Sequence, residues 1–362
     1  MKTIGNERRI NRENSRPPWG WVASVSITLG ALLLAAHAAA QPVLTVAGYG
    51  GSYQAGMTST LIPEFEKTCK CKVNYIGGPT ATTVARLIAE KDRPSLDVAI
   101  IDDGPQARVA AMGLIAPLDP TKVTNLVDVF KVGRLPGDVG VWLGVTAMGL
   151  TYNTKYFSEH GMAPPTSWND LARPDLKGKV AYPSIATALG IAWLVMEAKA
   201  NGGSESNIDP GFIAIIKVKD NALMFDKTAD LAPLYQQGTI VAGAMANHRT
   251  GVLAKQGFPV AFVYPKEGAV ASVQTVSVVK GGPQPELAQS FVNFLLSPST
   301  QELLANTVYA GPLNRKAKLS DETRKIVVTS ADLDKLVPLD WKTVTDNLGG
   351  WTERWNKEIE SR

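Results

Sequence analysis

The sequence predicts an α/β fold, in which strands and helices alternate along a chain of 362 residues. Short apolar runs that end at glycine, proline or aspartate are typical of strands, and the amphipathic runs between them are typical of helices. The run at 96–101 (LDVAII) is nearly all apolar, which is typical of a parallel strand covered on both faces. Such alternation predicts doubly wound sheets with flanking helices, whose ligands bind at the carboxyl ends of the strands.

The first forty residues predict a secretory signal. A basic segment precedes an apolar run at 21–36, and the small residues AHAAAQ follow. This is the order of a cleavable export signal, and the apolar run is shorter than the roughly 20 residues of a membrane span. We expect cleavage after Ala40 or Ala38 and a mature chain in the periplasm. The Arg8-Arg9 pair leaves twin-arginine export open beside the general route.

The amino-acid composition is typical of a globular protein with a large hydrophobic core. Hydrophobic residues make up 45% of the chain and charged residues 19%, which excludes a disordered chain and a membrane protein with several spans. The net charge is +4, and residues 1–40 hold five basic and two acidic residues, or +3 of it. The mature chain is therefore close to neutral, and we expect no nucleic-acid partner.

The sequence predicts three strand–helix units in the first half of the chain. The expected strands lie at 43–47, 72–75 and 96–101. The expected helices lie at 53–67 and 80–91, and a third follows the break at 102–105 and ends near 113. The strands end at breaks around 50–53, 78–82 and 102–103. We therefore expect ligand contacts at these three breaks.

The second half continues the alternation after a long apolar strand at 141–153. Further strands are expected at 179–182, 223–225, 239–245, 260–264 and 273–279, and helices at 186–200, 231–237, 250–256 and 285–296. Residues 320–362 are expected to form a helical cap that contains Trp341, Trp351 and Trp355.

The two cysteines, Cys69 and Cys71, lie at an expected helix–strand junction. A disulfide across this separation would close a very small ring, which bond geometry disfavours. A metal site would need more Cys or His residues than the chain offers nearby. We therefore expect two incidental thiols, no bound metal and no cofactor.

Several ordered segments resemble one family. They are the loop Tyr49 to Tyr53 after the first strand, FEKTCKCKVNYIGG, LDVAIIDD with GLIAPLD, VTAMGLTYN, PTSWNDLARPDLKGKV, GTIVAGAMAN, VYPKEGAV and FVNFLLSPSTQELLA. Together they span nearly all of residues 43–315. The chain resembles the periplasmic solute-binding proteins of ABC importers, especially the spermidine/putrescine-binding group and its thiamine-, phosphonate- and ferric-binding relatives.

The resemblance implies a type II periplasmic binding protein, with two doubly wound lobes joined by crossing strands. Lobe 1 is expected at 41–145 plus 272–312, and lobe 2 at 146–271 plus 313–362, with crossings near 142–148, 271–275 and 309–314. The implied function is the capture of a small solute in the interlobe cleft by hinge closure. The implied partners are the solute and permease subunits of the inner membrane, and we expect a monomer.

Carrying the polyamine-binding pattern over to this sequence partly fails. After the strand at 179–182 the family's acidic positions read Ser184-Ile185-Ala186-Thr187, and Ala246 stands where an aromatic is usual. Gln274 replaces an aspartate. We therefore expect an anionic or zwitterionic solute, such as a phosphonate, a carboxylate or a thiamine-like compound. Polyamine binding is the alternative, and ferric binding is disfavoured because a Tyr-Tyr pair is absent.

The expected ligand contacts lie at strand ends, at helix N-termini and on the crossing segments. They are Gly51, Ser52, Tyr53, Thr80, Thr82, Asp102, Asp103, Trp142, Ser184, Thr187, Asn247, Arg249, Gln274 and Tyr309. Backbone N–H groups and hydroxyls at helix N-termini favour anions, and an arginine binds an acid group in bidentate fashion. Alternatives remain: core packing for the aromatic residues, helix capping for the aspartates, a plain turn for the glycines and a solvated position for Arg249.

An enzyme is the competing class. The chain has no G-x-S-x-G, H-E-x-x-H or phosphate-binding G-x-x-x-x-G-K-[ST] motif, and the mature part holds only His160 and His248. The Asp102–Asp103 pair is a weak acid–base candidate, because adjacent residues on an extended segment point to opposite sides. We therefore expect a binding protein without catalytic residues, or a sensory receptor on the same fold.

Overall fold

The computed structural model describes residues 41–219, 222–225 and 231–360, so the expected signal lies outside the described residues. The strands are β1 (Val43–Gly48), β2 (Lys72–Gly77), β3 (Val98–Asp102), β4 (Ile115–Ala116), β5 (Val141–Asn153), β6 (Val180–Pro183), β7 (Ala222–Phe225), β8 (Ala242–Ala246), β9 (Val260–Val263), β10 (Ala269–Val279) and β11 (Leu336–Val337). No helix in these ranges is long and apolar enough to cross a bilayer.

The helices fall mostly between the strands, as alternation requires. They are α1 (Gly51–Gly56), α2 (Ile62–Cys69), α3 (Thr80–Ala89), α4 (Asp103–Ala111), α5 (Thr154–Glu159), α6 (Ala188–Ala200), α7 (Asp209–Lys219), α8 (Leu231–Gln236), α9 (Asn247–Lys255), α10 (Pro285–Leu295), α11 (Pro298–Thr307), α12 (Asp321–Arg324) and α13 (Trp341–Trp355). A π-helical turn η1 (Met57–Leu61) joins α1 to α2, and another, η9 (Asn356–Glu360), follows α13.

The strands form one mixed sheet in the order β2-β1-β3-β10-β5-β8-β6-β7, with β4 and β11 beside β10 and β9 beside β5. β1 pairs in parallel with β2 and β3, and β6 pairs in parallel with β7 and β8. The two long strands between these groups, β5 and β10, are antiparallel to each other. The predicted α/β class is confirmed.

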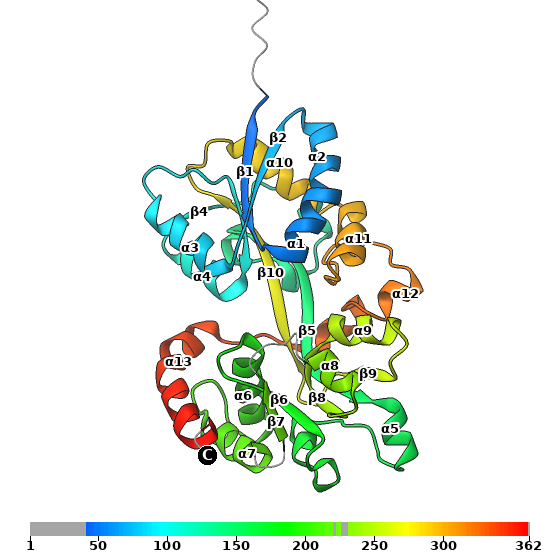
Figure 1. Cartoon of the computed structure of the whole chain (residues 1–362). Helices are drawn as coiled ribbons and strands as arrows, with labels where there is room; N and C mark the ends of the chain where they lie inside the picture. The colour runs from blue at the N-terminus through cyan, green and yellow to red at the C-terminus, as the bar shows by residue number, and fades with distance from the viewer. Residues whose placement is uncertain (1–40, 220–221, 226–230, 361–362) are drawn as a thin grey trace, which may run out of the picture. The chain divides into compact units, whose positions relative to one another are not determined.

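The elements gather in two lobes (Figure 1), and the two largest hydrophobic clusters of the described residues lie one in each lobe. Lobe 1 is the part built on β1 to β4, α1 to α4, α10 and α11, and lobe 2 is built on β6 to β9, α5 to α9 and α13. β10 pairs with β3 in lobe 1 through Gln274–Val278, and β5 pairs with β8 in lobe 2 through Met148–Tyr152. Between these regions Gly144–Met148 pairs with Val270–Gln274. These two stretches form the hinge segment, and they overlap the crossings expected at 142–148 and 271–275.

The segment 309–314, where a third crossing is expected, lies beside the hinge segment. Gly311 bridges to Val145 of β5, and the Asn314 side chain donates to the Leu296 carbonyl in lobe 1. The chain next joins the sheet at β11, where Leu336 and Val337 pair with the start of β10.

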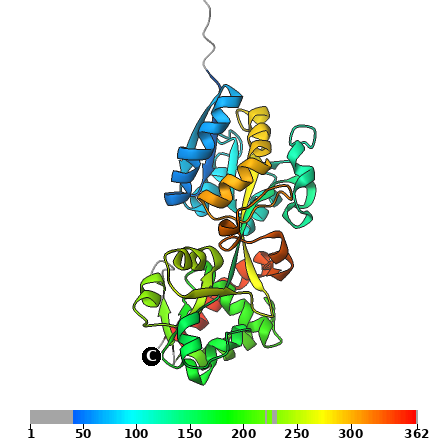
Figure 2. The ribbon, with the colours of Figure 1, turned by 90° about the vertical axis from the view of Figure 1, so that its right-hand side faces the viewer.

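Lobe 1 is stabilised by helices whose apolar faces pack against the buried strands of the sheet. On α10 the buried residues Ala288, Phe291, Val292 and Leu295 recur at helical spacing, which places them on one face. Phe65 of α2 meets the Phe291 ring edge-on at 4.9 Å, so α2 and α10 cover the same side of the sheet (Figure 2).

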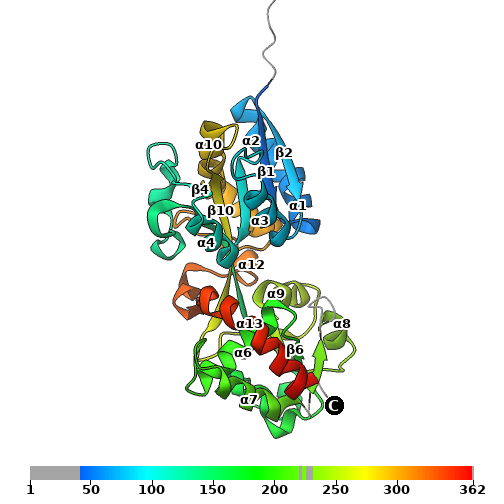
Figure 3. The same ribbon diagram turned by 90° about the vertical axis from the view of Figure 1, so that its left-hand side faces the viewer.

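Lobe 2 is centred on α6, which is buried along most of its length. The Trp193 ring lies 5.2 Å from Tyr182 of β6 and 6.4 Å from Trp355 of α13. Trp351 and Trp355 attach α13 to this core, and Figure 3 shows α13 beside α6 and β6. Helix α13 is therefore packed into the core of lobe 2.

A buried carboxyl group lies within this core. The Glu197 side chain accepts a 2.9 Å hydrogen bond from the Trp193 indole, but its Oε2 atom has no partner among the described residues. Burial, with a smaller effect from the Glu267 charge, raises the pKa of Glu197 from 4.5 to about 7. The ionised form is therefore disfavoured in the folded state.

We predict that Glu197→Gln stabilises the protein above neutral pH. Because the folded-state pKa of Glu197 is raised, its contribution to stability is full below pH 4.5 and is lost as the pH rises through about 7. Thermal or urea unfolding should show a gain of about 2 kcal/mol for the variant at alkaline pH, shrinking towards zero in acid. The exposed Glu353→Gln is the matched control. A gain that does not change with pH would contradict the prediction.

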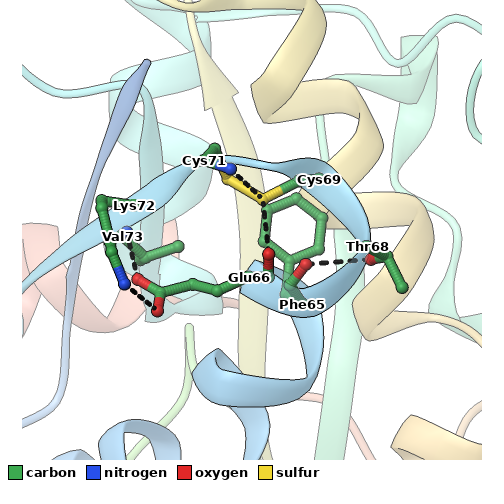
Figure 4. The surroundings of a disulfide bond; sticks show 7 residues. All are labelled: Phe65, Glu66, Thr68, Cys69, Cys71, Lys72 and Val73. Carbon is green, nitrogen blue, oxygen red and sulfur yellow. Dashed lines mark hydrogen bonds and ion pairs between the residues drawn. A yellow bond between two sulfur atoms is a disulfide. The ribbon is translucent and has the colours of Figure 1, made fainter. Parts of the chain in front are cut away.

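The expectation of free thiols is wrong: Cys69 and Cys71 form a disulfide (Figure 4). Lys70 between them adopts a left-handed conformation (φ 54°), which turns the chain and brings the two Cα atoms to 5.2 Å. Beside the bridge, the Glu66 carboxylate accepts hydrogen bonds from the Val73 N–H and the Lys72 ammonium. The bridge and these bonds fix the turn from α2 into β2.

Candidate functional site

The carboxyl ends of β1, β2 and β3 meet at Asp102. Its Oδ1 atom accepts a 2.7 Å hydrogen bond from the Tyr49 hydroxyl, and its Oδ2 atom accepts one of 2.7 Å from the Thr80 hydroxyl. Tyr49 follows β1, Thr80 begins α3 after β2, and Asp102 ends β3. Parallel pairing brings these three strand ends to one edge of the sheet. Gln274 of β10 lies directly across from Asp102 in register.

Burial and the Asp102 charge keep the Tyr49 hydroxyl protonated. Burial is the larger cause and the neighbouring carboxylate the second, and together they raise the pKa of Tyr49 far above its usual value. Tyr49 is therefore a hydrogen-bond donor that orients the Asp102 carboxylate at neutral pH.

Asp103 begins α4 and accepts a 3.0 Å hydrogen bond from the Gly104 N–H. The pKa of Asp103 is raised to about 6. Burial is the main cause and the Asp102 charge adds to it, whereas donation from the Gly104 N–H and the Trp341 indole opposes the shift. Both aspartates line one cavity, although adjacent residues on an extended strand are expected to point to opposite sides. The alternation rule ends with the strand at Asp102, and Asp103 already belongs to a helix.

This cavity has a volume of about 200 Å³ and is bordered by both lobes and the hinge segment. We call it the interlobe cavity. Its lining comprises Asp102, Asp103 and Pro105 from lobe 1, Met148, Val270, Ala271, Ser272 and Val273 from the hinge strands, and Ala188, Ala192 and Trp341 from lobe 2. Two carboxylates therefore face a wall that is otherwise mainly apolar.

Ala188, the first residue of α6, also lines the cavity. The first N–H groups of a helix have no partner within it. The Thr187 hydroxyl accepts from the Gly190 N–H at 3.0 Å. Within the described part of the chain, the N–H groups of Ala188 and Leu189 have no acceptor. The positive end of this helix can therefore accept an acid group.

Other expected contact residues of lobe 1 lie near the same edge. Gly51 is exposed with a left-handed backbone (φ 64°), and Thr82 is exposed on α3. Tyr53 is buried beside Tyr49, and its hydroxyl has no partner in the described ranges. The side chain of Ser52 lies outside the described residues.

Two expected contact residues have structural partners, one in the core of lobe 1 and one at the hinge. Trp142 is buried in the core of lobe 1. The Asn247 side chain accepts from the Ala147 N–H and donates to the Ile326 carbonyl, both at 2.8 Å. Both polar ends of Asn247 are therefore engaged with backbone at the hinge.

The remaining expected contact residues lie on lobe 2 or the hinge loop. The Ser184 hydroxyl donates to Glu360 at 3.3 Å, and Tyr309 packs beside Ile326 in a left-handed conformation. Arg249 is exposed near the start of α9 and has no ion pair with any described residue. Burial, and then the charge of Arg249, lower the pKa of the neighbouring His248 to about 4, so that this histidine is neutral.

Of the residues that line the interlobe cavity, only Asp102 and Asp103 were expected contacts; Met148 and Trp341 were not, nor was Tyr49, which binds Asp102. Tyr49 directly follows β1, and this position was the signal that could have identified it. Trp341 reaches the cavity from the far end of the chain, and no local pattern marks it as part of a site.

The chain therefore folds into two lobes with a cavity beside the hinge segment. Residues 60–328 match the family of bacterial extracellular solute-binding proteins. A Salmonella typhimurium protein named for periplasmic 2-aminoethylphosphonate binding is 24% identical over 82% of this chain and 86% of its own. A γ-aminobutyric acid-binding protein of Pseudomonas aeruginosa is 25% identical over 80% and 82%.

The solved structure of a spermidine/putrescine ABC transporter substrate-binding protein from Streptococcus pneumoniae shares the fold. The TM-score is 0.72 at 16% identity, and the match covers 87% of this chain and 99% of that one. The chain belongs to the family of bacterial extracellular solute-binding proteins. It is a solute-binding protein of the kind that serves ABC transporters, and relatives of this kind are named for binding rather than for catalysis.

Proposed function

We propose that the chain captures a small zwitterionic solute, with an amine at one end and an acid group at the other, and delivers it to an ABC permease. One observation carries the proposal: the carboxylates of Asp102 and Asp103 and the free N-terminus of α6 border the same interlobe cavity. One end of the cavity therefore favours a cation, and the other favours an anion.

The amine of the solute contacts Asp102 and Asp103. Each Asp102 oxygen has one hydrogen-bond donor from the protein and can accept another. The Trp341 indole stands beside Asp103 and offers an aromatic face to the ammonium group. Apolar hinge residues such as Val270 and Met148 line the path that a short alkyl chain would occupy.

The acid group of the solute contacts the N–H groups of Ala188 and Leu189. Arg249 is a further contact in this proposal, because its guanidinium is exposed and unpaired among the described residues. A solute that touches lobe 1 with its amine and lobe 2 with its acid favours the closed arrangement of the lobes. We further propose that residues 1–40 are removed on export to the periplasm, and that the monomer docks on permease subunits of the inner membrane.

The names of two relatives support this solute class. Both 2-aminoethylphosphonate and γ-aminobutyric acid carry one amine and one acid group separated by a short alkyl chain. The chemistry that the two relatives share is the chemistry that the interlobe cavity offers.

Calorimetric titration of refolded residues 41–362 tests the proposal. The ligands are 4-aminobutyrate, 2-aminoethylphosphonate, and the half-molecules butyrate and butylamine. At least one zwitterion should bind about 100-fold more tightly than either half-molecule, because each half-molecule loses a charge-assisted contact. Equal affinity for a zwitterion and a half-molecule, or no binding of any zwitterion, would reject the proposal.

Polyamine binding is the second candidate, and the adjacent carboxylates with the Trp341 ring favour it. The free N-terminus of α6 disfavours it, because a second ammonium group would face the positive end of a helix. Putrescine included in the same titration decides between them. Binding of putrescine more tightly than 4-aminobutyrate would favour the second candidate.

We predict that the affinity for a zwitterion falls as the medium is made acidic. Asp103, with a pKa of about 6, is ionised at neutral pH and becomes protonated below that value. Each pH unit below about 6 should weaken amine binding by up to tenfold, and Asp103→Asn should flatten the profile. Titrations at neutral and acidic pH measure the dependence. A wild-type affinity that is constant down to about pH 5 would contradict it.

A further inference from the structure

A larger hollow adjoins the interlobe cavity. It has a volume of about 810 Å³ and lies between α3 and α4 of lobe 1 and α13 of lobe 2. We call it the α13 groove. The two hollows share Asp102, Pro105 and Trp341 as lining residues. Trp341 has the largest side chain of the three, and it borders both hollows.

The indole is held in this position from both sides. Asp340 caps α13 by accepting from the N–H groups of Lys342 and Thr343, and Trp351 and Trp355 fix the helix in lobe 2. On lobe 1 the ring packs onto Gly104, where a Cβ atom would lie 2.8 Å from the Trp341 Cγ. The ring therefore reaches from one lobe to the backbone of the other.

The indole N–H group of Trp341 lies beside Asp103. The Trp341 Nε1 atom is buried beside Asp103, whose pKa it lowers as a donor, but the approach falls short of full hydrogen-bond geometry. Such an atom costs free energy unless another group satisfies it. The N–H edge of the indole therefore lies at the Asp103 end of the interlobe cavity.

The α13 groove has the chemistry of a site for an alkyl chain with an acid end. Its apolar lining includes Ala81, Val84, Ala107 and Ala111. Arg108 also lines it and has no ion pair with any described residue, whereas Lys342 is paired with Asp346 at 2.7 Å. The alkyl chain of a ligand that extended past Trp341 would therefore contact these small apolar side chains, and its acid end would reach the unpaired Arg108.

We propose that Trp341 is a specificity-determining residue that limits ligand length. Its indole closes the interlobe cavity to solutes longer than a few methylene groups, and its removal joins the cavity to the α13 groove. This inference rests on the proposed function. Without the indole, a longer ω-amino acid keeps its amine on Asp102 and Asp103 and places its acid group beside Arg108.

A chain-length series from 4-aminobutyrate to 8-aminooctanoate tests the inference by calorimetry. Wild type should bind the short members and lose about tenfold or more in affinity along the series, because an over-long ligand must displace packed groups. Trp341→Ala should reverse this order and gain about tenfold for 8-aminooctanoate, whereas Trp341→Phe should restore the wild-type order. Adding Arg108→Gln to Trp341→Ala should remove the gain.

The controls separate this inference from the proposed function. Trp351→Phe alters the same helix in the core of lobe 2 and should leave the length preference unchanged. If Trp341→Ala fails to fold, Gly104→Ala is the second variant, because its methyl group displaces the same indole and leaves every other site side chain in place. The Gly104→Ala protein should then prefer longer ligands than wild type does. An unchanged preference in folded variants would overturn the inference while the proposed function stands. Failure of wild type to bind any member would reject the proposed function first.

Discussion

Asp103→Asn should weaken the binding of 4-aminobutyrate by about 100-fold at neutral pH. The variant keeps the shape of the side chain but removes the charge that faces the ligand amine in the interlobe cavity. A hydrogen bond to a charged group contributes about 1.5–3 kcal/mol, which corresponds to roughly 10–100-fold in affinity. We expect the upper end, because Asp103 is partly buried and solvent screens it less than a surface charge. Titration calorimetry measures the loss.

The control for this prediction is Asp119→Asn, which removes a half-exposed carboxylate that pairs with Lys122 away from the cavity. It should leave the affinity unchanged. A dissociation constant for Asp103→Asn within about twofold of wild type would show that Asp103 does not bind the amine.

Gly190→Ala should destabilise the protein by about 3 kcal/mol and should also weaken ligand binding. A Cβ atom at Gly190 would lie within 3 Å of the Ser184 carbonyl and of the Ile185 nitrogen, which are backbone atoms and cannot rotate away. The loop from Ser184 to Thr187 would have to move, and with it the N-terminus of α6 that faces the cavity. Urea unfolding measures the loss of stability.

The matched control is Gly349→Ala on α13, where the added methyl group meets nothing within 4 Å. This variant should gain about 0.5–1 kcal/mol, because alanine is the better helix former. Equal effects of the two substitutions would contradict the packing that we describe around the start of α6.

Most of the strands could be predicted because they are short, apolar and followed by glycine, proline or aspartate. The long strand β5 was predicted with its observed ends, and β3 was predicted from an apolar run with an aspartate pair behind it. β10 begins four residues earlier than the predicted strand at 273–279. Its first residues, Ala269 to Ser272, include small side chains with no clear alternation, because they belong to the hinge rather than to one lobe.

Helix α7 was not predicted, for a physical reason. Its sequence DPGFIAIIKVK is apolar on nearly every side, with Ile213 exposed and Phe212 fully buried. It therefore lacks the one-sided pattern by which an amphipathic helix is identified. The disulfide was not predicted because it depends on a left-handed residue, Lys70, that no residue pattern signals.

The site was only partly predictable. Thr80, Asp102 and Asp103 lie where strand ends place them, and a strand–helix pattern is enough to predict such positions. Trp341 and the start of α6 meet Asp103 only because β5, β10 and α13 bring the two lobes together. Such contacts between residues distant in the chain depend on packing, which the local pattern does not contain.

A crystal structure of residues 41–362 with the tightest zwitterion of the series is the most direct test of a ligand held between Asp102–Asp103 and α6. We expect the amine nitrogen within hydrogen-bond distance of an Asp102 or Asp103 carboxylate oxygen. We expect the acid oxygens at the N–H groups of Ala188 and Leu189. A solute bound with its acid group towards Asp103, or bound only in the α13 groove beyond Trp341, would contradict this assignment.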